Sequence, residues 1–223
     1  MSTTQQDESP SLALHVLLRG SAKTDAEKQA QKHAQDSIRA WWTALSPSDL
    51  STEDRYKKLA DFARLDRGDR AELRRSVNPY DAANSLAVHL LAKRLYGADY
   101  TTSQLLDLAL VAGVLAEVRT DIPKQTFIKS LGSAPAGSDK PQMSLLRFQR
   151  LQTCDSLEDF FQQARRAVKL IKQQVDVVDL AAELLAWAHE FQYGPAELPK
   201  DRLKLRWATA YYCHAELSPT AAD

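Results

Sequence analysis

The segment from Thr102 to Val118 is apolar on almost every side when it is wound as a helix. A helix that is apolar all round lies inside a protein or a membrane. No window of the chain approaches the ~20 apolar residues that a membrane span requires. We therefore expect this segment to be the central helix of a bundle, buried through Leu105, Leu106, Leu108, Val111, Val114, Leu115 and Val118.

Other segments with helical periodicity precede and follow this central one. Asp25 can cap a helix that runs to Leu45, Asp66 or Asp69 can cap a short helix that ends before Pro79, and Thr101 or Thr102 can begin the central helix. No run of alternating apolar and polar residues is long enough for a strand, so the predicted fold class is all-α. Further helices are predicted over residues 52–65, 80–95, 143–152, 155–174, 176–191 and 199–214, with Asp155 and Asp176 as the caps of two of them.

A stretch rich in Gly, Pro, Ser and Ala at residues 130–141 separates two sets of predicted helices. We expect two small helical-bundle lobes joined by this Gly/Pro-rich linker. Their predicted bounds are residues 25–125 and residues 140–216. A mobile N-terminal tail is predicted at residues 1–24, which are polar apart from a short apolar stretch.

Motifs of the common enzyme classes are absent from the sequence. We find no Walker A motif and no GxGxxG, HExxH or GxSxG pattern. Cys154 and Cys213 have no CxxC or metal-ligand spacing, so we expect two small buried side chains. No catalytic residue, metal or cofactor is therefore predicted. Because the acidic start at Asp7 and Glu8 does not resemble a signal peptide, a cytoplasmic location is expected.

Basic residues are concentrated in a few of the predicted helices, although the chain has 29 basic and 29 acidic side chains in total. In the helix predicted at 155–174, a helical wheel places Arg165, Lys169 and Lys172 in a stripe beside the apolar arc, with Arg166 further round. Two further groups are Arg147 with Arg150, and the set Arg64, Arg67, Arg70, Arg74 and Arg75, which Asp66, Asp69 and Glu72 dilute.

Exposed guanidinium and ammonium groups are suited to phosphate oxygens. Nothing in the chain resembles an aromatic stacking platform or a zinc knuckle, so contact with the nucleic-acid backbone is expected rather than reading of bases. The same stripes also occur on plain solvated helix faces, and internal ion pairs can absorb such charges. A scaffold that binds only protein is the main alternative, whereas a transcription regulator would show a compact helix-turn-helix that we do not find.

The segment LDRGDRAELRRS at Leu65–Ser76 resembles the LDxGxxAxLRR segment of the CasB family. This family is the small subunit of the type I-E CRISPR surveillance complex called Cascade. Further blocks follow in the order of the family over roughly residues 36–213, although Ser133 stands after SLG where the family pattern often has arginine. These blocks are SLG at 130–132, LLRFQRLQ at 145–152, QQARRAVKLIK at 162–172, VDVVDLAAELLAW at 175–187 and RWATAYY at 206–212.

The resemblance implies a non-catalytic protein of two helical lobes, two copies of which pack head to tail as a dimer along the complex. Its partners would be the large subunit, the backbone subunits, the guide RNA and the target DNA, and it would help to stabilise the R-loop. We expect Arg74, Arg75, Arg165 and Arg166 to lie on solvated faces. The resemblance and the charge clusters together predict these nucleic-acid-binding residues: Arg67, Arg70, Arg74, Arg75, Arg147, Arg150, Arg165, Arg166, Lys169 and Lys172.

Overall fold

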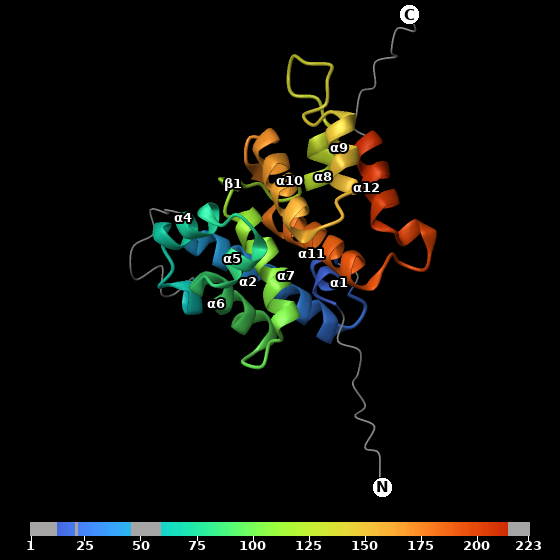
Figure 1. Cartoon of the computed structure of the whole chain (residues 1–223). Helices are drawn as coiled ribbons and strands as arrows, with labels where there is room; N and C mark the ends of the chain where they lie inside the picture. Colours follow the sequence, from blue (N-terminus) through green and yellow to red (C-terminus); the bar gives the residue numbers. More distant parts are fainter. Residues whose placement is uncertain (1–12, 21, 46–58, 214–223) are drawn as a thin grey trace, which may run out of the picture.

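A computed structural model describes residues 13–20, 22–45 and 59–213 of the chain, and this part is mostly helical (Figure 1). The predicted helical class is thereby confirmed. The α-helices are α1 (Leu14–Arg19), α2 (Asp25–Leu45), α4 (Arg67–Arg75), α5 (Pro79–Ala83), α6 (Leu86–Tyr96), α7 (Thr102–Leu115), α8 (Phe127–Gly132), α9 (Leu145–Gln152), α10 (Leu157–Leu170), α11 (Val177–Tyr193) and α12 (Leu203–Tyr212). Two 3-10 helices are η1 (Ala60–Phe62) and η2 (Pro199–Asp201).

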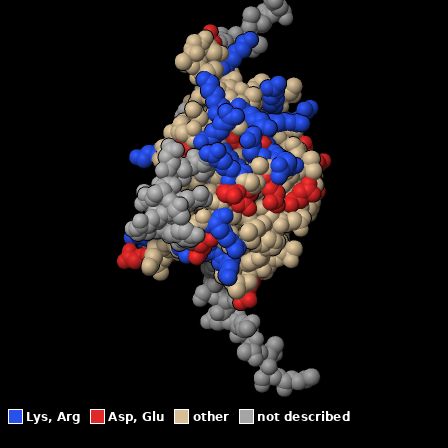
Figure 2. Space-filling view, turned by 90° about the vertical axis from the view of Figure 1, so that its left-hand side faces the viewer, with Lys and Arg blue, Asp and Glu red and all other residues tan. Residues whose placement is uncertain are grey.

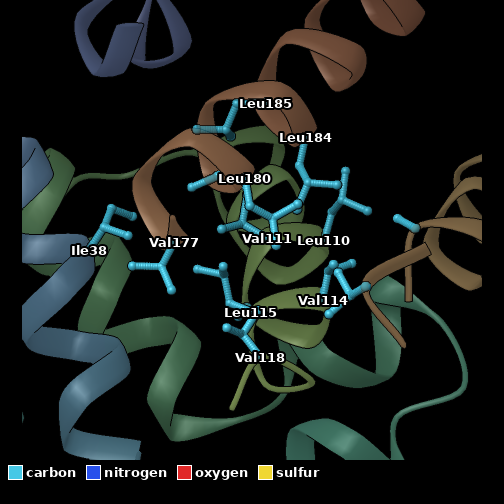
Figure 3. Packing of buried hydrophobic residues seen from close by; sticks show 14 of the residues in the cluster. Ile38, Leu110, Val111, Val114, Leu115, Val118, Val177, Leu180, Leu184 and Leu185 are labelled. Carbon is cyan, nitrogen blue, oxygen red and sulfur yellow. The ribbon is translucent and has the colours of Figure 1, made fainter. Parts of the chain in front are cut away.

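Helix α7 lies at the centre of the molecule, as its apolar sequence predicted (Figure 1). Every residue from Leu108 to Val118 is buried. Figure 3 shows the side chains of α7 and α11 that meet between the two helices, with Ile38 of α2 at their edge: Leu110, Val111, Val114 and Leu115 of α7, and Val177, Leu180 and Leu184 of α11. Full burial of each large aliphatic side chain contributes roughly 1.5–3 kcal/mol, so this contact is a main source of stability.

Side-chain caps explain where α2, α4, α5, α6, α7, α10 and α11 begin. Three of these caps were among the residues predicted from the sequence: Asp66 for α4 and Thr101 for α7, each one of two candidates, and Asp176 for α11.

The predicted caps of α2 and α10 were each wrong by one residue. In α2 the hydroxyl of Thr24 accepts the backbone N–H of Glu27 at 3.2 Å, so Thr24 and not Asp25 is the cap. Ser156 has the extended backbone of a cap and its hydroxyl accepts the third backbone N–H of the helix, so α10 begins after Ser156 and not after Asp155.

A short parallel ladder joins the segment after α7 to the segment before α11. It consists of β1 (Thr120–Asp121) and β2 (Gln174–Val175), with Thr120 opposite Gln174. Arg39 of α2 holds both segments, because it donates to Asp121 and to Asp176 at 2.8 Å each. Strands of two residues leave no alternating pattern in the sequence, which is why neither was predicted.

The segment predicted as a mobile tail contains α1, which packs against α11 with Leu18 buried. Residues 1–12 and the first half of the helix predicted at 52–65 lie outside the described residues. Buried apolar side chains from both halves belong to one contiguous cluster, and residues 130–132 of the predicted linker form the end of α8. The division into lobes at 25–125 and 140–216 stays a prediction.

The two cysteines lie near helix ends. The expectation of two buried cysteines was wrong, because Cys213 at the end of α12 is exposed and Cys154 is half-buried. Each lies near the end of a helix, where fewer neighbours cover it. In the part of the chain that the structure describes, no helix is both long enough and apolar enough to cross a membrane.

Candidate nucleic-acid interface

Lys and Arg side chains gather over one face of the molecule, above a row of Asp and Glu side chains (Figure 2). Helix α4 lies on this side of the molecule (Figure 1). Three exposed arginines belong to α4 and its C-terminal turn: Arg67, Arg74 and Arg75. Helix α10 contributes exposed Arg166 and Lys169, and ion pairs to one common carboxylate bring the two helices together.

That carboxylate belongs to Glu117, which follows α7 and whose side chain is only 2% exposed. It pairs with Arg165 at 2.6 Å, with Lys169 at 3.4 Å and with Arg74 at 3.5 Å. Burial alone would raise the pKa of Glu117, but the hydrogen bond and charge of Arg165, with Lys169 and Arg74, hold this pKa below its usual range. Three cations therefore surround one charged carboxylate, and the cluster keeps a positive excess.

Arg165 does not lie on a solvated face as predicted, because it is 8% exposed. Its Nε and Nη2 atoms donate to Oε1 of Glu117 at 3.0 and 2.6 Å. Nη1 donates to the carbonyl of Ser76 at 2.6 Å, and Nη2 also donates to the carbonyl of Arg74. The guanidinium lies 5.1 Å from the centre of the Phe161 ring. The wheel placed Arg165 beside the apolar arc correctly, but α4 and Glu117 cover its side chain.

Arg70 is half-buried and anchors α4 to the end of α7. Its guanidinium donates to the carbonyl of Ala116 at 3.0 Å and to the carbonyl of Val118. Burial lowers the pKa of Arg70, and the nearby charges of Arg74 and Arg119 lower it further. The head group of this predicted site residue is therefore engaged within the protein.

The other predicted site residues carry exposed side chains. Arg147 and Arg150 lie on α9, a separate helix that packs against α10. Lys172 lies in the turn after α10 and Lys169 in the last turn of that helix. The complete exposed set is Arg67, Arg74, Arg75, Arg147, Arg150, Arg166, Lys169 and Lys172.

Two residues of this region were missed by the sequence analysis, the buried Glu117 and the exposed Arg119. Arg119 is exposed, and its backbone N–H donates to the carbonyl of Gln173 at 2.8 Å, which places it beside the turn that carries Lys172. A lone acid at the end of an apolar helix was the available signal for Glu117. Arg119 left no signal, since it belongs to none of the helical charge clusters.

The turn that carries Lys172 has an unusual backbone. Lys172 and Gln173 have positive φ angles of 57° and 62°, which residues other than glycine rarely adopt. The side chain of Gln173 donates to the carbonyl of Glu117 at 2.8 Å and helps to hold this conformation. Such backbone persists only where the surrounding structure over-determines it, so the position of Lys172 is tightly defined.

The exposed Lys and Arg side chains give this surface a positive charge, which attracts anions. Within the described ranges, no group of three or more His, Cys, Asp or Glu side chains is placed to hold a metal ion. Burial raises the pKa of the Cys154 thiol to about 12, so this thiol is protonated at neutral pH and is a poor nucleophile.

Comparison with known families gives one match. The family described as CRISPR-associated protein Cse2 matches residues 69–212, which are 144 of the 223 residues. The matched region begins inside α4 and ends with α12, so it contains Glu117 and its three cationic partners. No similar curated protein and no similar solved structure was found. The chain therefore belongs to the Cse2 (CasB) family, whose members are structural small subunits of the type I-E CRISPR surveillance complex Cascade.

Proposed function

We propose that the protein stabilises the assembled surveillance complex and its R-loop through sequence-independent contacts between basic side chains and nucleic-acid backbone. Two copies would pack head to tail beside the large subunit and the backbone subunits, near the guide RNA and the target DNA. The observation that carries this proposal is the cluster around Glu117. One buried carboxylate faces three cations, and two of them, Arg74 and Lys169, have side chains that are 45% and 55% exposed.

A few contacts with the nucleic-acid backbone are enough to stabilise an R-loop, because its formation is nearly balanced in free energy. The guide–target duplex is about as stable as the DNA duplex that it replaces, so a few contacts between protein and backbone can decide the balance. Phosphate contacts also predict a distinctive response to salt. Each contact releases bound counterions, and the logarithm of the affinity falls by about 0.9 per contact for each tenfold rise in salt.

The test uses a reconstituted complex that carries Arg74→Ala, Arg75→Ala, Arg166→Ala and Lys169→Ala together. We expect weaker target binding and a shallower dependence on salt than in the wild type. A matched control removes the same number of exposed lysines from other helices: Lys28→Ala and Lys32→Ala of α2, Lys200→Ala of η2 and Lys204→Ala of α12. Equal target binding by the four-residue variant and the control would contradict the proposal.

A scaffold that binds only protein is a second candidate, because several large apolar side chains are exposed. Leu146 is 74% exposed, Tyr193 68% and Leu198 57%. Exposed apolar groups of this size are suited to contacts between subunits. Under this alternative, substitutions at these positions would disrupt assembly, whereas the basic substitutions would leave target binding unchanged.

A further inference from the structure

We infer that Arg165 is a positioning residue, which presents Arg74 and Arg75 of α4 to nucleic acid and makes no phosphate contact itself. This inference rests on the proposed function and concerns how the basic surface is built. It reverses the role that the sequence predicted for Arg165, since all of its described donors point into the protein.

Side chains of α10 donate hydrogen bonds to backbone carbonyls of residues 74–77, the segment in which α4 ends and which we call the exit of α4. Arg165 donates to the carbonyls of Arg74 and Ser76, and Gln162 Nε2 donates to the carbonyl of Val77 at 2.5 Å. Gln162 and Arg165 are three residues apart on α10, so they lie on the same side of that helix. The carbonyls at the end of a helix lack partners within the helix, and a cation there also interacts favourably with the helix dipole.

Helix α4 needs this support because it is only nine residues long. Isolated helices shorter than about 12–15 residues are marginal in water, so tertiary contacts decide where α4 lies. Its N-terminal half is held by Arg70 on the carbonyl of Ala116. Its C-terminal end, which carries Arg74 and Arg75, is held by Arg165.

Glu117 contacts both Arg165 and Arg74 from the interior of the protein. Its Oε1 atom accepts from Arg165, while its buried Oε2 atom has no hydrogen-bond partner and lies 3.5 Å from Nε of Arg74. The carboxylate thus orients Arg74 from the protein side, and about half of that side chain stays exposed to solvent. A lysine at position 165 would keep the charge but lacks the planar fork that reaches a carboxylate and two carbonyls at once.

The first experiment is a double-mutant cycle in the reconstituted complex, in which target affinity is measured at several salt concentrations. We expect Arg165→Lys to lower the salt slope as much as Arg74→Ala with Arg75→Ala, by about 0.9 for each lost contact. Adding Arg165→Lys to that double variant should cause no further loss. Losses that add, or a wild-type slope in Arg165→Lys, would overturn the inference.

A milder pair of variants covers the case in which Arg165→Lys does not fold. Gln162→Ala removes only the bond to the carbonyl of Val77, and we expect a smaller loss of salt slope with faster amide exchange at residues 74–77. Gln163→Ala is the matched control, because within the described part of the chain the side chain of Gln163 donates to Asp159 of the same helix and not to α4. Equal slopes and equal exchange in the two variants would overturn the inference. If the target affinity of the wild-type complex did not change with salt, the proposed function itself would be contradicted.

Discussion

The guanidinium of Arg165 and the carboxylate of Glu117 form a buried ion pair at 2.6 Å, although 48 residues separate them in the chain. The pair joins α10 to the end of α7, and Arg165 extends the connection to the exit of α4. Removing one partner of a buried pair leaves the other charge without compensation. The pair is therefore a stability element that lies beneath the basic surface.

We expect Arg165→Ala to lower the free energy of unfolding by about 3 kcal/mol, the lower part of the range for a broken buried pair, because Lys169 and Arg74 still face Glu117. The neighbouring Arg166→Ala removes an exposed side chain and should change stability by less than about 0.5 kcal/mol. Urea unfolding of both variants measures the difference. Equal midpoints would show that the pair contributes nothing.

Asp179 should make stability depend on pH. Its pKa is raised to about 7, first by burial and then by the charges of Glu183 and Asp176, while the N–H of Phe127 and the charge of Arg19 act in the opposite direction. A raised pKa means that the folded state binds the proton more tightly than the unfolded state. This contribution is complete below about pH 4 and is lost as the pH rises through about 7.

The variant Asp179→Asn tests this, since its amide oxygen can still accept the N–H of Phe127, which now lies 2.7 Å from the carboxylate. We expect the variant to gain stability relative to the wild type between pH 5 and pH 8. Thermal melts at both values provide the comparison. A constant difference between the two proteins would refute the assignment.

Gly132→Ala should destabilise the contact between α8 and α12. A Cβ atom at this position would lie 2.3 Å from the backbone carbonyl oxygen of Tyr211, so one of the two helices must shift. Overpacking of this kind costs roughly 1–3 kcal/mol. Thermal melts should show the loss, while Ser133→Ala, the adjacent control at the C-cap, should melt near the wild type.

Trp207→Ala should lower the free energy of unfolding by roughly 3–5 kcal/mol, because the indole is 2% exposed and its loss leaves a cavity. The Nε1 atom of Trp207 also donates to Glu183 at 2.5 Å. Trp207→Phe keeps most of the ring but not the donor and should lose less. Trp187→Ala should behave like Trp207→Ala, since Trp187 is 6% exposed and stacks on Phe160 with ring centres 3.8 Å apart.

The isolated protein should bind nucleic acid weakly and with little preference for sequence. If a few phosphate contacts carry the binding, raising salt from 50 to 200 mM should weaken it by at least about tenfold. Fluorescence anisotropy with two unrelated oligonucleotides measures both properties. Strong preference for one oligonucleotide, or affinity that does not change with salt, would speak against backbone contact.

Several features of the fold could be predicted from the sequence because they depend on neighbours within a few residues. The burial of α7 follows from its apolar surface, and the starts of α4, α7 and α11 follow from Asp66, Thr101 and Asp176. The apolar arc of α10, which includes Phe160, is buried as its spacing required. Family membership, too, could be inferred from short blocks in a fixed order.

The tertiary structure alone decided which polar side chains on those helices meet water. Arg165 and Arg166 are adjacent in one basic stretch, yet the first is buried and the second is exposed. Periodicity gives the angle of a side chain on its own helix but not the element that covers it. Glu117 and the carbonyls at the exit of α4 reach Arg165 only after α4, α7 and α10 have packed, so chain segments far apart in sequence set its role.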